Sequence, residues 1–348
     1  MSLSGQLSIR LDCQDQVVRS AQVVLQRPVV AISQLLVGLS PVALLERIPL
    51  LFALCAGAQQ VAAVRALEQA VNWQAAPEVE LARSRLTELE LIRESLVRLV
   101  QDWPLPLPLA SLKALLQRCQ QGINELQPWL GFRVQPMLHD PQPLHRCMTE
   151  LQARWPEVEA CAQGDWLSPH PALSSQHPQQ PLPDVLDLLG LTALLPNLRL
   201  GQMEAEINGQ PRTTGPAAAA QAGVSLGEQL VQRVQALMRR AAQAVAGLNH
   251  PPTIACIPGL EAGEGVGRVK TARGCLLQRV QVQGQQVRQW QMIAPTDWNF
   301  HPQGVLTRQL SGLVLPTDPA EAEALVRALV LSIDPCVDFV LHWESSHA

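Results

Sequence analysis

The stretch Thr317-Asp-Pro-Ala-Glu-Ala-Glu-Ala-Leu-Val-Arg-Ala-Leu-Val-Leu-Ser-Ile-Asp-Pro-Cys-Val-Asp-Phe-Val-Leu-His342 decides how the rest of the chain is interpreted. Asp318 is a favourable N-cap, and the proline after it suits the first helical position. The helix is expected to end at Ser332 or Ile333, because the residue before the second proline is disfavoured in the α region. A capped helix therefore delivers one thiol, Cys336, at a stiff turn.

Composition indicates a large globular chain. Of its 348 residues, 47% are hydrophobic and 16% are charged, which is enough for a sizeable core. No uncharged apolar run approaches the roughly 18 residues of a membrane helix. The first residues lack the basic and then apolar pattern of a signal peptide. We therefore expect a cytoplasmic protein with no membrane insertion.

Charge and cysteine usage argue against a nucleic-acid-binding protein and against a disulfide-stabilised protein. The net charge is −4, and no basic run or aromatic platform supports nucleic-acid binding. The 8 cysteines include no Cys-x-x-Cys pair, which favours separate reduced thiols over a disulfide framework. For any one of these thiols, the ordinary interpretation is a small buried hydrophobe.

Hydrophobic periodicity predicts a mainly helical α+β fold. Alternation over residues 7–13 and 17–25 predicts an N-terminal β-hairpin. A short apolar helix is expected at residues 29–37, and amphipathic helices are expected at residues 86–100 and 112–126.

Capping and turn residues predict further boundaries. A helix begins after Ser40, and Pro49 is expected to break it before a second helical run over residues 50–70. A capping box at residues 225–228 opens a helix that ends at about residue 246. Alternating strands on both sides of Gly284 predict a second hairpin.

Residues 163–183 are rich in Pro, Gln and His, and we expect them to form a flexible loop within a single domain that spans residues 1–348. A short apolar helix is predicted after it, at residues 185–194. Several histidines lie in or near this loop, but their spacing matches no zinc motif, so we interpret them as solvated. They are His139, His145, His170 and His177.

The C-terminal stretch resembles a motif of [NiFe]-hydrogenase large subunits, Asp-Pro-Cys-x-x-Cys-x-x-His. Asp334, Pro335, Cys336 and His342 match it, whereas Phe339 stands at the second cysteine position. The resemblance therefore keeps one thiol of this motif and loses the other.

Residues 50–70 resemble the other metal-binding motif of these large subunits, Arg-x-Cys-Gly-x-Cys-x-x-x-His followed by Val-Arg-Ala. Aligning the Val-Arg-Ala of residues 64–66 places Cys55 at the second cysteine, Phe52 at the first and Gln59 at the histidine. Taken alone, the stretch favours a buried helix that carries an incidental thiol.

The strongest match covers residues 270–299. It resembles a family block that reads Glu-Ala-x-Arg-Gly, a hairpin, and then Val-Pro-Ser/Thr-Thr-Trp-Asn. A turn-rich segment at residues 208–216 also resembles the Gly-x-Pro-x-x-x-Gly-Pro sequence of large subunits. Order and spacing are kept in the block, and the retained residues are Arg273, Gly274, Pro295, Thr296, Trp298 and Asn299.

Two acidic residues of the family pattern are missing. Ser4-Gly5-Gln6 stands where large subunits have a glutamate that binds a structural cation. Arg27 lacks the glutamate that follows it in the family and passes protons to the active site. The resemblance thus implies a retained fold that has lost a cation contact and the proton gate.

For the fold, the resemblance implies a degenerate, shortened [NiFe]-hydrogenase large-subunit fold, mainly helical α+β with peripheral β-hairpins. In that family four thiolates hold nickel, and two of them bridge to an iron that carries cyanide and carbon monoxide. Only Cys55 and Cys336 keep thiols here. We therefore expect no nickel, and we expect these two thiols to bind an Fe(CN)2(CO) unit. Their sulfur atoms should then approach within roughly 3–4.5 Å.

The resemblance also implies cofactor-binding roles outside the thiols. Arg273 matches an arginine that donates to one cyanide, and Thr296, with the backbone near Pro295, matches the donor to the other. The alternative is that Arg273 forms an ordinary ion pair with Asp334 or Asp297.

Together these features resemble the HupK/HoxV-type hydrogenase accessory proteins. That resemblance implies a scaffold rather than an enzyme, with two kinds of partner: the maturation proteins that build the iron unit and the cognate hydrogenase large subunit. Two alternatives stay open. One is a structural chaperone that binds no metal, and the other is a divergent active hydrogenase that needs nickel, a proton route and a small subunit.

Overall fold

The computed structural model describes residues 5–103, 105–136, 141–163, 167, 171–174, 182, 205–207, 209–221, 223–248 and 261–345. The chain divides into two compact units, each built from segments that are distant in the sequence. Unit 1 comprises Met1–Pro28, Leu167–Ala236 and Ile293–Ala348, and unit 2 comprises Val29–Trp166 and Leu237–Met292.

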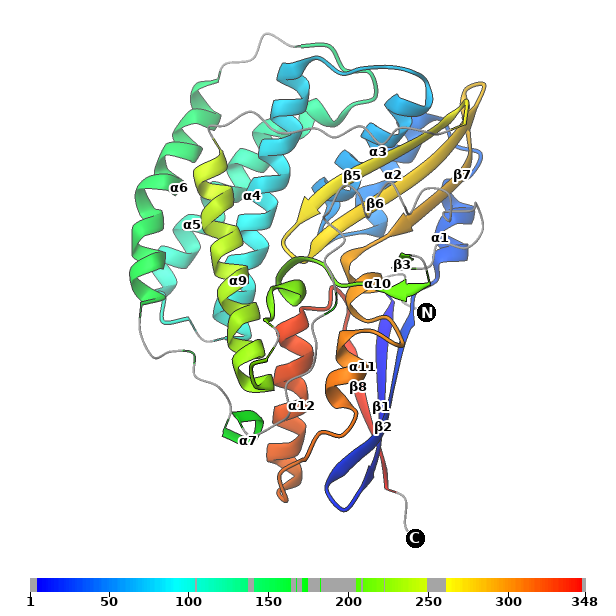
Figure 1. The fold of residues 1–348 in the computed structure, drawn as a ribbon. Helices are drawn as coiled ribbons and strands as arrows, with labels where there is room; N and C mark the ends of the chain where they lie inside the picture. Colours follow the sequence, from blue (N-terminus) through cyan, green and yellow to red (C-terminus); the bar gives the residue numbers. More distant parts are fainter. Residues whose placement is uncertain are drawn as a thin grey trace. The chain divides into compact units, whose positions relative to one another are not determined.

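A three-stranded sheet in unit 1 joins the two ends of the chain. β1 (Gln6–Gln14) and β2 (Val17–Gln26) form the predicted antiparallel hairpin. β8 (Phe339–Ser345), which the sequence did not predict, pairs with β1 in parallel. Figure 1 shows the two blue strands and the red strand side by side. The alternating residues Leu7 and Ile9 are fully buried, as their period of two requires.

The C-terminal helix of unit 1 packs against α11 (Val305–Leu310) and η2 (Gly215–Ala219). α12 (Pro319–Ile333) is capped by Asp318, whose carboxylate accepts a hydrogen bond from the Ala320 backbone N–H at 2.8 Å, and it ends where the sequence predicts. The remaining elements are α7 (Pro171–Ser174), β3 (Glu206–Ile207), β4 (Gln210–Pro211) and α10 (Pro295–Asn299).

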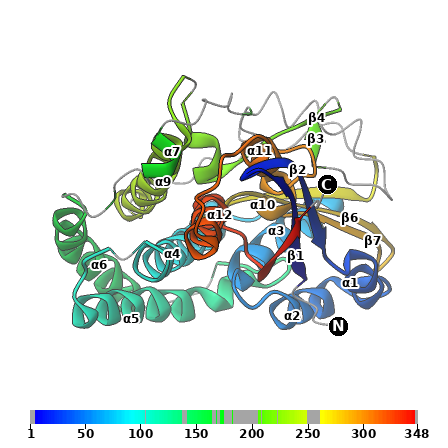
Figure 2. The ribbon, with the colours of Figure 1, turned by 90° about the horizontal axis from the view of Figure 1, so that it is seen from below.

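Unit 2 is mainly helical and contains the helices predicted in this part of the chain, although the run predicted from residue 50 begins at Ala56 and the helix predicted from residue 86 begins at Pro77. The helix α6 was not predicted. Figure 2 shows α4, α5 and α6 as neighbours, coloured from cyan to green. α9 (Leu226–Gly247) begins in unit 1, at the predicted capping box, and ends in unit 2. The other helices are α1 (Val29–Leu36), α2 (Pro41–Leu51), α3 (Ala56–Ala70), α4 (Pro77–Gln101), α5 (Leu109–Leu126), η1 (Gln127–Leu130) and α6 (Gln142–Cys161).

A second three-stranded sheet supports α3 in unit 2. It consists of β5 (Glu264–Thr271), β6 (Gly274–Gln283) and β7 (Gln286–Ile293), and the turn at Gly284 confirms the predicted second hairpin. β5 was not predicted. It packs directly against α3. The approach is so close that a Cβ atom on Gly267 would lie only 1.8 Å from the carbonyl oxygen of Ala62, so only glycine fits at this position.

The prediction that Pro49 breaks a helix was wrong, because the helix ends two residues after this proline. α2 continues through Pro49 to Leu51. A proline has no N–H for the carbonyl four residues earlier. That carbonyl, of Leu45, instead accepts a hydrogen bond from Gln60 Nε2 at 3.1 Å, so the helix continues to its C-cap at Phe52.

Several predictions lie wholly or partly outside the described residues. They are the helix at residues 185–194, most of the 163–183 loop, and His139, His170 and His177. Inside the loop, α7 is described, and His145 lies exposed on α6. No helix in the described ranges is both long and apolar enough to cross a membrane.

Candidate functional site

Cys336 lies at a sharp turn in unit 1, as the sequence predicts. α12 ends at Ile333, and its C-cap residue, Asp334, adopts the left-handed conformation with φ 61°. β8 begins at Phe339 and is hydrogen-bonded to β1. The half-buried thiol therefore stands between a helix and a strand that are both anchored, so its position has little freedom.

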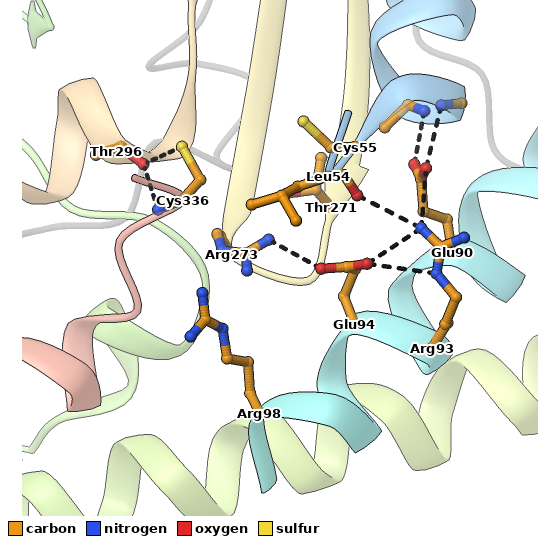
Figure 3. A network of polar contacts seen from close by, with 12 residues as sticks. Leu54, Cys55, Glu90, Arg93, Glu94, Arg98, Thr271, Arg273, Thr296 and Cys336 are labelled. Carbon is orange, nitrogen blue, oxygen red and sulfur yellow. Dashed lines mark hydrogen bonds and ion pairs between the residues drawn. The ribbon is translucent and has the colours of Figure 1, made fainter. Parts of the chain in front are cut away.

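Two polar side chains, Thr296 and Arg27, face the Cys336 sulfur. The hydroxyl oxygen of Thr296 lies 2.8 Å from Sγ and accepts a hydrogen bond from the Cys336 backbone N–H at 3.3 Å (Figure 3). A hydroxyl group can both donate and accept, so Thr296 donates to the sulfur when Cys336 is a thiolate, which carries no proton of its own. Arg27 donates from Nη2 to Sγ at 3.6 Å. Such donors offset negative charge on the sulfur, and the thiolate is the form that binds metals.

Asp297 holds Arg27 in this position. Its two carboxylate oxygens accept hydrogen bonds from Arg27 Nη1 at 2.8 and 2.7 Å, and one of them also accepts the Ala294 N–H at 2.6 Å. That last bond caps α10, where Pro295 is the first helical residue and Thr296 the second. Asp297 therefore forms an ion pair with Arg27. Sequence reasoning assigned no role to Arg27, because its partner Asp297 lies 270 residues further along the chain.

Asn299 has a structural role in the retained block of unit 1. Its side chain accepts a hydrogen bond from the Thr214 N–H at 2.8 Å and donates to the Thr214 carbonyl at 3.2 Å. Both residues are buried. This pair of bonds connects the turn-rich segment at residues 209–216 to α10, so two of the retained motifs form one structure.

Cys55 occupies the N-cap position of α3 in unit 2 and is half-buried. Its side chain does not cap the helix. The carboxylate of Glu90, from α4, does so instead: it accepts hydrogen bonds from the Gly57 N–H at 3.1 Å and the Ala58 N–H at 2.7 Å (Figure 3). Arg93 donates to the Leu54 carbonyl at 3.5 Å, which further restrains the residue before the thiol.

Arg273 lies in the turn between β5 and β6 of unit 2, and its side chain is 4% exposed. Its Nη1 lies 3.6 Å from Oε2 of Glu94, which also forms an ion pair with Arg93 at 3.1 Å (Figure 3). A distance of 3.6 Å is an ion pair rather than a hydrogen bond. The sequence missed Glu94, although its position four residues after Glu90 on a helix places both carboxylates on one face.

Packed aromatic rings stand at the two positions where the resemblance loses a thiol. The Phe52 ring lies 6.2 Å from the Trp290 ring in unit 2. The Phe339 ring lies 5.2 Å from the Arg327 guanidinium in unit 1. In the described part of the chain, no group of three or more His, Cys, Asp or Glu residues is placed to hold a metal ion.

The predicted site residues therefore divide between the units. Unit 1 brings Cys336, Thr296 and Pro295 together, and unit 2 contains Cys55 and Arg273. The approach of the two sulfur atoms, and the contacts of Arg273 and Thr296 with cyanide, stay predictions.

Glu90 should make the stability of the chain depend on pH. Burial raises the pKa of the Glu90 carboxyl from 4.5 to about 6, with Arg93 and the α3 N–H groups opposing the rise and Glu94 adding to it. The folded protein then binds this proton more tightly than the unfolded chain does. The associated stability, roughly 2 kcal/mol, is present below pH 4.5 and is lost as the pH rises through 6.

This expectation is tested by urea unfolding of the wild type and Glu90→Gln between pH 4 and pH 7.5. The wild type should lose stability relative to Glu90→Gln across this range, because glutamine does not titrate. Glu78→Gln, a change at an exposed position on the same helix, serves as the control and should track the wild type. Parallel pH profiles of the unfolding free energy for the wild type and Glu90→Gln would contradict a raised pKa of the Glu90 carboxyl.

Comparison with known proteins places these features in a family. Residues 199–342 match the nickel-dependent hydrogenase family. The hydrogenase expression/formation protein HupV of Azotobacter chroococcum mcd 1 is 49% identical over 338 residues, covering 97% of this chain and 98% of that protein. The hydrogenase expression/formation protein HupK of Azotobacter vinelandii is 48% identical over 343 residues, with the same coverage.

Solved structures show the same fold at much lower identity. The [NiFeSe] hydrogenase of Desulfomicrobium baculatum aligns with a TM-score of 0.58 and 13% identity, over 94% of this chain and 95% of that one. The enzyme of Desulfovibrio vulgaris Hildenborough aligns with a TM-score of 0.53 and 12% identity, over 93% and 94%. This confirms the expected mainly helical α+β fold of a hydrogenase large subunit. With near-complete coverage of the HupV and HupK relatives, the chain belongs to the HupK/HupV family of hydrogenase expression/formation proteins.

Proposed function

We propose that this accessory protein binds the Fe(CN)2(CO) unit as cargo and passes it to a hydrogenase large subunit. The observation that carries the proposal is the donor arrangement around Cys336, where Thr296 and Arg27 both face the sulfur. A thiol used only for packing would not require a buried arginine and a hydroxyl group beside it.

The chemistry of the cargo suits these residues. A low-spin iron that already carries three diatomic ligands needs only a few further donors, and thiolates are the soft ligands that it prefers. Cyanide ligands bring negative charge, which Arg27 and Arg273 are suited to balance. In the proposal Cys55 and Cys336 are the protein ligands, and Arg273, Thr296 and the backbone at Pro295 contact the diatomic groups.

A carrier must also release its cargo, and fewer thiolates favour release. The proposal expects no nickel and no hydrogenase activity, since aromatic rings stand at two of the four positions that carry thiols in the family. The proposed partners are the proteins that build the iron unit and the hydrogenase large subunit that receives it.

Infrared spectroscopy of protein purified from cells that co-express the maturation proteins tests the proposal. Cyanide and carbonyl stretching bands are expected in the wild type and should be lost in Cys336→Ala and in Cys55→Ala. Thr296→Val keeps the thiol but removes the hydroxyl donor, so it should weaken retention by about 10–100-fold. Cys13→Ala in unit 1 and Cys161→Ala in unit 2 are matched controls, because both are half-buried thiols outside the site.

Other outcomes point to the alternatives. Wild-type protein without these bands, together with normal hydrogenase maturation by both cysteine variants, would indicate a structural chaperone that binds no metal. Stoichiometric nickel and hydrogen uptake by the purified chain would indicate a divergent hydrogenase.

A further inference from the structure

A chain of side-chain hydrogen bonds in unit 2 ends at two sulfur atoms. The indole N–H of Trp290 donates to Gln278 Oε1 at 2.9 Å, and Gln278 Nε2 donates to Gln59 Oε1 at 2.5 Å. Gln59 Nε2 then lies 3.2 Å from Met292 Sδ and 3.8 Å from Cys55 Sγ.

The orientation of both amides follows from the first donor. An indole N–H can only donate, so the Gln278 oxygen must face Trp290 and its NH2 group must face the Gln59 oxygen. The NH2 group of Gln59 is thereby directed at the two sulfur atoms. Gln59 and Met292 are almost fully buried, at 2% and 5% exposure, so water does not compete for the contact between Gln59 and Met292.

A thioether and a thiol that share one amide group form a pair of soft donors. We call Cys55 and Met292 the sulfur pair. Thiolate and thioether ligands select soft metal ions, including Cu(I) and low-spin iron, over hard ones. Each sulfur has more than one lone pair, so it can bind a metal with one and still accept the Gln59 N–H with another.

Gln59 also stands at the position where the resemblance has a histidine. Unlike a histidine, an amide does not change its charge near neutral pH. The Gln59 amide therefore donates its N–H groups to the sulfur pair independently of pH. The arrangement places a thiol and a thioether beside the same amide group within unit 2 alone.

We propose that Met292 is a metal ligand that acts together with Cys55, and that Gln59 positions the sulfur pair. The expected occupant is a soft, low-spin metal centre, and its identity as the iron unit rests on the function proposed above. Met292 would then supply a second sulfur donor from the same unit as Cys55.

NMR of protein labelled with 13C at the methionine methyl groups tests the sulfur pair without any iron loading. The Met292 signal is assigned by its absence in Met292→Leu. One equivalent of Cu(I), added under anaerobic conditions, should shift that signal in the wild type and should leave it unshifted in Cys55→Ala. The signal of Met148, a buried methionine on α6, is the internal control and should stay in place. An unshifted Met292 signal in the wild type would overturn the proposal.

Infrared spectra of iron-loaded protein separate this inference from the proposed function. Met292→Leu should shift the carbonyl and cyanide bands and speed their loss on gel filtration, whereas Met148→Leu should not. If Met292→Leu leaves the bands unchanged while Cys55→Ala removes them, Met292 is a packing residue and the iron carrier stands. If the wild type shows no bands but Cu(I) shifts the Met292 signal, the sulfur pair stands and the iron cargo is rejected.

Discussion

Replacing Arg83 with methionine is expected to lower the free energy of unfolding by about 3–5 kcal/mol, because it leaves two buried carboxylates without their shared cation. Arg83 is fully buried on α4. It donates to Glu68 at 2.7 and 2.9 Å and to Glu80 at 2.8 Å, and its remaining N–H groups reach the backbone carbonyls of Trp129 and Gly131, both at 3.1 Å.

The loss should also disturb the helix that carries Cys55 at its start, since Glu68 belongs to α3. Urea unfolding followed by tryptophan fluorescence measures the change. Arg118→Met is the matched control, because Arg118 and its partner Glu150 form an exposed ion pair, which is worth about 0–1 kcal/mol. Equal effects of the two substitutions would show that the buried cluster contributes no more than a surface pair.

Gly267→Ala is expected to destabilise unit 2 by more than about 3 kcal/mol, because the added methyl group overlaps backbone and no side-chain rotation relieves it. A Cβ atom at this position would lie 1.8 Å from the Ala62 carbonyl oxygen and 3.0 Å from the Ala66 nitrogen. α3 and β5 would have to separate, and α3 would lose the support that the sheet provides.

The yield of soluble protein and the urea midpoint are the measurements for this prediction. Gly131→Ala provides the control within the same unit. Its backbone has φ −65°, and an added Cβ would meet only Val134, at 3.6 Å, which is ordinary contact. If Gly267→Ala unfolded at the same urea concentration as Gly131→Ala, the close approach of α3 and β5 would have to be abandoned.

Local signals in the sequence predicted most of the described helices and two hairpins, β1–β2 and β6–β7. The cap at Asp318, the capping box at residues 225–228 and the alternation before Cys13 all act within a few residues of the chain. Pro49 shows where such signals fail, since a distant side chain, that of Gln60, compensated for the missing N–H.

In the candidate site, too, local motifs were predictable from the sequence and distant contacts were not. The chain order of the retained motifs was sufficient to name Cys55, Cys336 and Arg273 as candidates. Their neighbours were not predictable, because Glu94 and Met292 belong to no motif and become relevant only when α4 and β7 are folded.

By itself, the sequence determined the capped helix that ends before Cys336, the family resemblance and the two thiols that survive. Only the tertiary structure decided that Arg27, 309 residues away in the chain, faces the Cys336 sulfur. It also decided that Glu90 caps the helix at Cys55 and that β8 pairs with β1. The physical reason is that caps and periodicity depend on neighbouring residues, whereas the partner of a buried charge or a strand edge depends on how distant segments pack.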